Sequence, residues 1–174
     1  MRKHVLFLLI LFPYLLFAQD REYMSLLIEL DNYIANNFVS PFFSKNVKFI
    51  NDNYNGFGFK RNIFTNNIRF SNSGTILCDI DEEIYSMDNG IIMEIGYNES
   101  GQFILIKYDE IYVYYYRVNP ININEGDIIE KQQLIGRIRS PYYSFGPALI
   151  LKIFYKDHFF DPYFLLYRII CYYE

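Results

Sequence analysis

The stretch GIIMEIGYNESGQFILIKYDEIYVYYYRV, from Gly90 to Val118, contains three runs of mostly apolar residues separated by two polar turn signals. The first turn signal is Asn98-Glu99-Ser100-Gly101 and the second is Asp109-Glu110. Residues of these types suit the tight connections of β-hairpins. Three strands joined by two short turns have to run antiparallel, so this stretch predicts a meander at the centre of an antiparallel sheet.

The same pattern continues on both sides of this meander. Further strands are expected at residues 75–80, 133–138 and 148–155, and upstream Tyr23, Leu27, Leu30 and Ile34 have the spacing of an amphipathic helix. The sequence therefore predicts a mainly β fold with an antiparallel β-sheet or β-sandwich and a short N-terminal helix. We expect an N-terminal helical segment at residues 19–45 and one β domain at residues 46–174.

Residues 1–18 have the composition of a secretory signal peptide. Arg2, Lys3 and His4 are followed by the apolar run Val5 to Phe17, which ends at the small residue Ala18. This run is shorter than the roughly 20 apolar residues that span a membrane. We therefore expect an exported protein, periplasmic or extracellular, with no transmembrane segment after cleavage; a signal that stays uncleaved is the alternative.

The charge of the chain argues against nucleic-acid binding. The 174 residues carry 16 Lys and Arg and 20 Asp and Glu, and the loss of Arg2 and Lys3 with the signal leaves 16 − 2 = 14 basic residues, a net charge of −6. No basic run that could follow a phosphate backbone is present. Nucleic acid is therefore not an expected partner.

A series of short landmarks resembles the M23 family of zinc metallopeptidases, the lysostaphin-like or LytM-like domain. The landmarks occur in the order of that family and are Gly74-Thr75, Gly90, Gly101, Tyr115, Gly126-Asp127, Gln133-Leu134-Ile135-Gly136, Gly146-Pro147 and Asp161-Pro162. Each is weak alone, and the resemblance rests on their order over about two thirds to three quarters of the chain. It implies an M23-like β domain.

The resemblance also implies where a zinc site should be. The family holds Zn²⁺ with an early His-x-x-x-Asp motif and the second His of Gly-Pro-His-x-His, while the first His of that pair and the His of Tyr-x-His-Leu assist the reaction. In this sequence the Gly-Pro-His-x-His pair falls on Ala148 and Ile150, and the Tyr-x-His-Leu histidine falls on Arg117. The early motif falls on Thr65 and Arg69 or, one residue earlier, on Phe64 and Ile68.

The residues at these positions cannot supply the ligands of that family. Residues 60–73 contain no His, Asp, Glu or Cys, so a shift of register does not help, and after signal cleavage His158 is the one histidine left. We therefore expect no zinc, no other cofactor and no catalytic residues of the M23 kind. The residues that replace the site, Tyr115, Arg117, Ala148, Ile150 and Lys152, become candidates for a groove or contact surface.

Aromatic side chains fall on both faces of the strand that contains Tyr115. Tyr112, Tyr114 and Tyr116 alternate with Val113 and Tyr115, so alternation alone assigns no face to the core. Packing in the core with cross-strand pairing and an aromatic groove wall are both compatible with this pattern.

The leading hypothesis is a catalytically inactive M23-like domain that acts as a binding or regulatory module in cell-wall (peptidoglycan) remodelling. Its partner would be a cell-wall amidase, another envelope protein or peptidoglycan itself.

Two alternatives remain open. One is a hydrolase or endopeptidase with a non-standard site built from Asp79, Asp81 and Glu82 or from His158. The other is a structural module of the biotinyl/lipoyl type, which the stretch Asn124–Ile138 resembles, although no modifiable Lys stands at Asp88-Asn89-Gly90. Cys78 and Cys171 are compatible with a disulfide and equally with two separate buried thiols.

Overall fold

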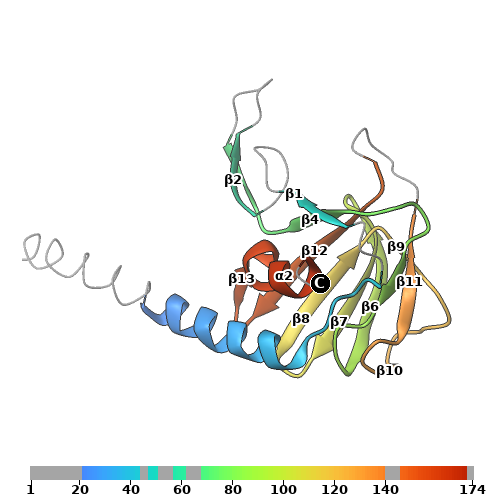
Figure 1. The fold of residues 1–174 in the computed structure, drawn as a ribbon, viewed down its shortest axis with the longest axis horizontal. Helices are drawn as coiled ribbons and strands as arrows, with labels where there is room; N and C mark the ends of the chain where they lie inside the picture. The colour runs from blue at the N-terminus through green and yellow to red at the C-terminus, as the bar shows by residue number, and fades with distance from the viewer. Residues whose placement is uncertain (1–20, 44–46, 51–56, 62–67, 140–145, 172–174) are drawn as a thin grey trace, which may run out of the picture.

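A computed structural model gives the structure, and it describes residues 21–43, 47–50, 57–61, 68–139 and 146–171. The predicted signal peptide, residues 1–18, lies outside these ranges. No helix among the described residues is long and apolar enough to cross a membrane. Figure 1 shows a strand-rich body with the N-terminal helix, residues 21–37, running along one side of it.

One large antiparallel sheet dominates the fold. Its strands in spatial order are β1 (Lys48–Ile50), β4 (Gly74–Leu77), β12 (Ala148–Tyr155), β8 (Ile111–Tyr116), β7 (Gly101–Tyr108), β6 (Gly90–Asn98) and β10 (Ile128–Ile129), with β13 (His158–Phe160) paired to β12. The predicted meander is therefore confirmed as β6, β7 and β8, which pair in sequence order.

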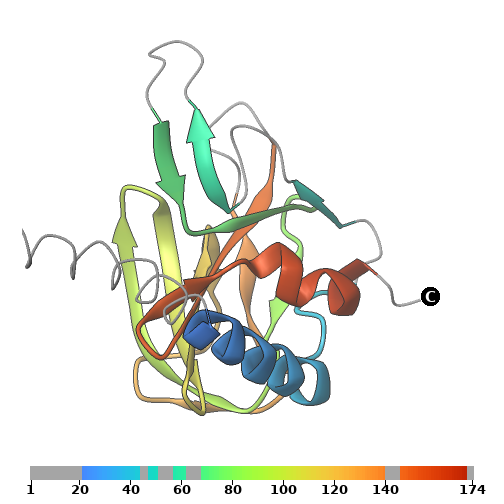
Figure 2. The same ribbon diagram turned by 90° about the vertical axis from the view of Figure 1, so that its left-hand side faces the viewer.

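Three smaller parts complete the structure. A second sheet contains β5 (Glu83–Tyr85), β11 (Leu134–Ile138) and β9 (Val118–Pro120), and a separate hairpin consists of β2 (Gly58–Arg61) and β3 (Ile68–Ser71). The chain then ends its described part in helix α2 (Pro162–Cys171). Figure 2 shows the N-terminal helix and α2 on the same side of the molecule.

The core lies on one face of the large sheet. Alternate residues of β7, β8 and β12 are fully buried there, and the helices and the second sheet add their apolar side chains to the same cluster. Leu30 and Ile34 come from the N-terminal helix, Leu165 from α2 and Ile135 from β11. The predicted N-terminal helix thus completes the core of the β domain, as its apolar stripe requires.

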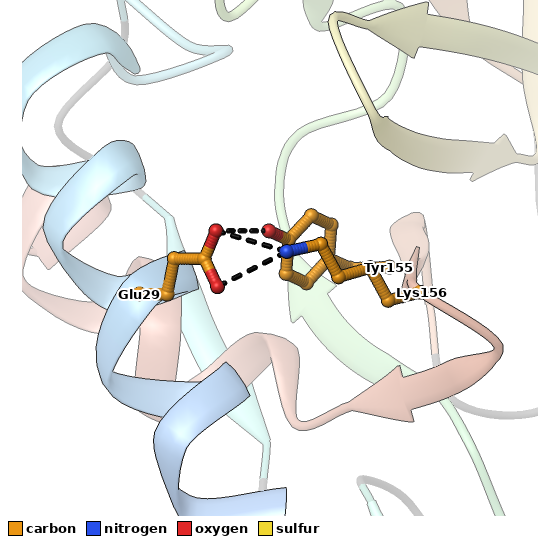
Figure 3. Close-up of polar contacts among 3 residues, drawn as sticks. All are labelled: Glu29, Tyr155 and Lys156. Carbon is orange, nitrogen blue, oxygen red and sulfur yellow. Dashed lines mark hydrogen bonds and ion pairs between the residues drawn. The ribbon is translucent and has the colours of Figure 1, made fainter. Parts of the chain in front are cut away.

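The N-terminal helix is also attached by polar contacts, which Figure 3 shows. The Glu29 carboxylate accepts hydrogen bonds from the Tyr155 hydroxyl at 2.7 Å and from Lys156 Nζ at 3.0 and 3.1 Å. These two contacts lower the pKa of Glu29, the bond from Tyr155 more than the one from Lys156. Because Tyr155 and Lys156 lie at the turn between β12 and β13, the contacts fix the helix to the end of β12.

The opposite face of the large sheet carries a second, smaller cluster. Phe103 and Leu105 of β7 and Tyr116 of β8 are buried in it, with Tyr112, Tyr114 and Ile150 packed around them. Register places Lys152 and Phe154 on the same face, because they pair with Tyr114 and Tyr112. We call this surface the outer face and define it by these eight residues.

Two expected strands need correction. The strand expected at residues 75–80 ends at Leu77, because the chain turns at Asp81, which has a φ of 62°. Cys78 therefore follows the strand instead of lying inside it. The strand expected to continue to Val118 breaks at Arg117, whose φ of 67° is incompatible with extended backbone, and Val118 enters the second sheet.

Helix α2 was not predicted, although its start has a clear signal. Asp161 Oδ1 accepts a hydrogen bond from the Tyr163 backbone N–H at 2.9 Å, and Pro162 occupies the first helical position. An Asp followed by Pro at a helix start satisfies one free N–H and removes another.

Candidate functional site

The strand β12 presents the candidate residues Ala148, Ile150 and Lys152. It follows Gly146-Pro147, where Gly146 has a φ of 86°, and Ala148 is its first residue. Ala148 is buried, and Ile150 and Lys152 are half-buried. The alternation expected for this strand is confirmed, because Leu149 and Leu151 face the core in between.

Arg117 occupies the turn between β8 and β9. Its backbone N–H donates to the Gln102 carbonyl at 2.7 Å, and its own carbonyl accepts from the Arg139 N–H at 3.1 Å. These two bonds hold Arg117 in left-handed backbone geometry. A residue with a Cβ adopts this geometry at a cost of about 1 kcal/mol. The Arg117 side chain is half-buried and brings a permanent positive charge to this end of β8.

Tyr115 does not belong to the contact surface, and this expectation is corrected. Its side chain is fully buried on the core face, where its hydroxyl lies 2.7 Å from that of Tyr108. The Tyr108 hydroxyl also contacts Ser86 Oγ at 3.1 Å, so the three groups form a buried chain of hydrogen bonds. Burial raises the pKa of Tyr108 to about 12 and that of Tyr115 well above its usual value.

Tyr114 and Tyr116, and not Tyr115, are the tyrosines of β8 that lie on the outer face near Ile150 and Lys152. Their rings are stacked with centroids 5.8 Å apart, and the Phe103 ring lies 5.5 Å from that of Tyr116. Alternation in the sequence could not choose between the two sets of tyrosines. The choice follows from the pairing of β8 with β12, whose odd-numbered residues are all apolar or tyrosine and face the core.

Two lysines lie over the tyrosine rings of the outer face. Lys152 Nζ is 4.8 Å from the centroid of Tyr116, and Lys107 Nζ is 5.7 Å from that of Tyr112. Such cation–π contacts hold a long side chain across the face of a ring. The outer face therefore combines aromatic rings with ammonium groups, which suits contact with another molecule. Its eight residues include no nucleophile with a paired base.

The Phe103 ring lies directly on the backbone of Gly96 in β6. A Cβ at Gly96 would come within 2.8 Å of that ring, so only glycine permits this approach. The ring thus covers the neighbouring strand and extends the aromatic surface from β8 to β6.

The residues at the family positions do not fit a zinc ion. Zinc needs thiolate, imidazole or carboxylate donors, and Ala148 and Ile150 have no donor atom, while Arg117 is a cation. Ile68 and Arg69 lie in β3, with side chains outside the described residues, and Phe64 and Thr65 lie outside them altogether. Among the described residues, no group of three or more His, Cys, Asp or Glu could hold a metal ion.

The structure places the two alternative hydrolase sites, the acidic residues and His158, at opposite ends of β12. Asp79 and Asp81 follow β4, whose last residue Leu77 pairs with Ala148 at the start of β12. His158 pairs with Tyr155 at the other end of β12. Seven residues of strand separate these points by roughly 23 Å.

His158 lies at the joint between the N-terminal helix and the large sheet. It is the first residue of β13, is half-buried, and its ring packs edge-on against Tyr23 of the N-terminal helix, with centroids 5.9 Å apart. The imidazole therefore has a packing role at the joint between helix and sheet.

Cys78 is a buried free thiol in this structure. Burial, chiefly, raises its pKa to about 12, so that the reactive thiolate is scarce at neutral pH. The Cys171 side chain lies outside the described part of the chain, and because Cys78 is free, the disulfide between the two is not present in this structure.

Comparison with known proteins now decides the family. The profile of Peptidase family M23 matches residues 69–162, which is more than half of the chain. This chain belongs to peptidase family M23. The match covers β6, β7, β8 and β12 and favours an M23 domain over a biotinyl/lipoyl-type module. No curated protein sequence matches this M23 chain significantly.

Solved structures share the fold of this M23 domain at low sequence identity. A zinc-containing peptidase from Vibrio cholerae has a TM-score of 0.61 and 17% identity over 72% of this chain and 39% of its own. The antimicrobial peptidase lysostaphin from Staphylococcus simulans has a TM-score of 0.61 and 20% identity over 79% of this chain and 56% of its own. This chain thus spans well under two thirds of either protein.

A third similar structure is that of a complex between SpoIIIAH and SpoIIQ. The TM-score is 0.58, with 16% identity over 72% of this chain and 97% of the matched one. At these identities the likeness concerns the fold.

Proposed function

We propose that this M23 domain is exported and acts without the zinc chemistry of its family, as a binding or regulatory module in peptidoglycan remodelling. The observation that carries the proposal is on β12: Ala148 and Ile150, which have no donor atoms, occupy the Gly-Pro-His-x-His positions of the family. A water molecule at this place has neither a metal nor an imidazole to activate it.

The outer face is the surface proposed for contact. The half-buried Tyr114 and Lys152 border the buried Tyr116 ring, so an accessible aromatic ring and a positive charge lie on the same face, and tyrosines carry much of the energy at binding sites. A partner would be a cell-wall amidase, another envelope protein or peptidoglycan. The occurrence of a similar fold in a complex of two proteins, SpoIIIAH and SpoIIQ, supports a role in assembly.

The absence of catalysis is tested on the purified chain without residues 1–18. After equilibration with zinc and gel filtration, we expect far less than one zinc per chain by elemental analysis. We also expect no release of soluble fragments from peptidoglycan, with an active M23 peptidase as the positive control. Stoichiometric zinc together with cleavage would overturn the proposal.

Binding is tested separately by sedimentation with bare sacculi and by co-purification from cell envelopes. We expect Lys152→Ala to reduce the bound fraction, because it removes the ammonium group from the Tyr116 ring. The matched control is Lys131→Ala, since Lys131 is an exposed lysine whose Nζ contacts the Asn37 carbonyl, away from the outer face. Equal binding by wild type and Lys152→Ala would remove the outer face from the proposal.

A further inference from the structure

The strand β6 has an open edge along most of its length. It runs from Gly90 to Asn98, and β10 pairs with it only at Gly90 and Ile91. In Figure 2 it is the outermost long strand on the left of the sheet. An unpaired strand edge presents a row of backbone donors and acceptors to any other extended chain.

The backbone groups that face outward can be identified. The backbone groups of Ile92 point away from β7. Its N–H donates to the Asp127 carbonyl, and its carbonyl accepts from the Gly126 N–H. A bulge follows, after which Ile95 faces outward and donates its N–H to Glu125 Oε1 at 2.9 Å. Since outward and inward groups alternate, the N–H and C=O of Tyr97 also face away from β7.

Those outward groups beyond Ile95 have no strand opposite them among the described residues. The N–H of Ile95 is satisfied by a side chain, the Glu125 carboxylate, which occupies the place of a carbonyl from a neighbouring strand. A carboxylate on a loop can swing away, whereas a backbone carbonyl of a paired strand cannot. The edge is therefore covered at one point by a replaceable group.

Apolar side chains are exposed along the same edge. The exposed fractions are 76% for Tyr97, 44% for Met93, 43% for Ile91 and 80% for Ile128 of β10. Ile91 and Ile128 pair with each other at the covered end of β6, whereas Met93 and Tyr97 lie along its unpaired part. Single exposed apolar residues are ordinary, but two of them beside free backbone groups favour an additional strand.

The negative charge around the edge of β6 favours a positively charged partner strand. Glu94, Glu99, Glu125 and Asp127 border it, and residues 90–100 and 121–129 contain no Lys or Arg. A second copy of this chain would bring the same carboxylates against one another, which is unfavourable. A strand with lysine or arginine side chains would be attracted.

We propose that the edge of β6 from Met93 to Asn98 binds an extended, basic segment of another protein as an added β-strand. The partner strand displaces Glu125 from the Ile95 N–H and pairs with the outward groups of Tyr97. This inference goes beyond the proposed function, because it concerns a different surface from the outer face and does not depend on the loss of zinc chemistry.

The test uses a short fluorescein-labelled peptide of alternating lysine and valine, titrated with the chain lacking residues 1–18 and followed by fluorescence anisotropy. A peptide of alternating glutamate and valine is the charge control. We expect saturable binding of the basic peptide that weakens several-fold as salt is raised, and no binding of the acidic one. Equal affinity for both peptides would overturn the proposal.

Two variants separate the backbone from the side chain. Tyr97→Pro removes the outward N–H without removing a bond to β7, and we expect it to weaken binding about tenfold. Tyr97→Ala keeps the N–H, leaves the charge the same and should cost clearly less. If the two variants lose the same affinity, strand addition is not the mode of binding.

A third measurement does not depend on the folding of any variant. The basic peptide with N-methyl groups on alternate residues keeps its charge but cannot donate along one edge, and we expect it to bind about tenfold more weakly. Hydrogen exchange at residues 93–98 should slow when the unmodified peptide is bound. Unchanged exchange there, or self-association of the chain that Tyr97→Pro abolishes, would contradict a basic partner strand.

Discussion

Ile150 of β12 lies directly opposite Tyr116 of β8, and the two side chains pack in the cluster on the outer face of the sheet. The position on which the zinc-binding histidine of the M23 family is expected to fall thus belongs to a small apolar cluster in this chain. We expect that returning one imidazole to it does not restore a site, because residues 60–73, where the early motif is expected, contain no His, Asp, Glu or Cys.

We therefore predict that Ile150→His binds no stoichiometric zinc and is less stable than wild type by about 1 kcal/mol, since it removes apolar contacts of a half-buried side chain. Elemental analysis and urea unfolding measure the two effects. Ile150→Val is the matched control and should lose less stability. Tight zinc binding by Ile150→His would mean that ligands lie close to β12 after all.

The hydroxyl chain in the core predicts an unequal effect of two similar substitutions. The Tyr108 hydroxyl contacts Ser86, Met87 and Tyr115, whereas the Tyr115 hydroxyl contacts Tyr108 and the Met87 backbone. Tyr108→Phe leaves buried groups without a partner and should cost about 2–3 kcal/mol, while Tyr115→Phe should cost about 1 kcal/mol. Chemical unfolding measures both, and equal losses would contradict the hydrogen-bond chain.

Gly136 is required by a close approach between β11 and β9. A Cβ there would overlap Val118 and lie 2.5 Å from the Asn119 carbonyl oxygen. We expect Gly136→Ala to destabilise the protein by about 2–4 kcal/mol, because backbone must move to admit the methyl group.

Gly126→Ala is the control for this prediction. Gly126 has a φ of 87° but open space around it, so the substitution should cost only about 1 kcal/mol of backbone strain. A melting curve of each variant gives the comparison. A larger loss of stability for Gly126→Ala than for Gly136→Ala would contradict the steric explanation for Gly136.

Glu29 gives the attachment of the N-terminal helix a dependence on pH. Its pKa in the folded protein is lowered by the hydrogen bonds from Tyr155 and Lys156, so the contact stabilises the fold above the ordinary carboxyl pKa of 4.5. That stabilisation is lost as the pH falls through the lowered pKa.

We expect Glu29→Gln to melt at a lower temperature than wild type at pH 7, and the difference to shrink below about pH 4. The effect should be small because the carboxylate is exposed to solvent. Glu22→Gln, an exposed acidic residue on the same helix, is the control and should show no such convergence. A difference that grows on acidification would refute the contact.

Much of the fold follows from local sequence. The meander from Gly90 to Tyr116 needs only apolar runs and the turns at Gly101 and Asp109, both of which have positive φ. The helix through Leu30 and Ile34 needs only its apolar stripe. Helix α2 also had its signal in Asp161-Pro162, which marks a helix start in local sequence alone.

The sequence by itself determined which residues stand at the expected ligand and catalytic positions, Ala148, Ile150 and Arg117, and from their identity it predicts that the zinc ligands of the family are missing. Tertiary structure decided which face each tyrosine of β8 takes. Tyr115 faces the core and Tyr116 the outer face because β8 is paired on both sides and one face is covered by the helices and the second sheet. That covering comes from segments distant in sequence, and a strand with aromatic residues on both faces carries no local signal for it.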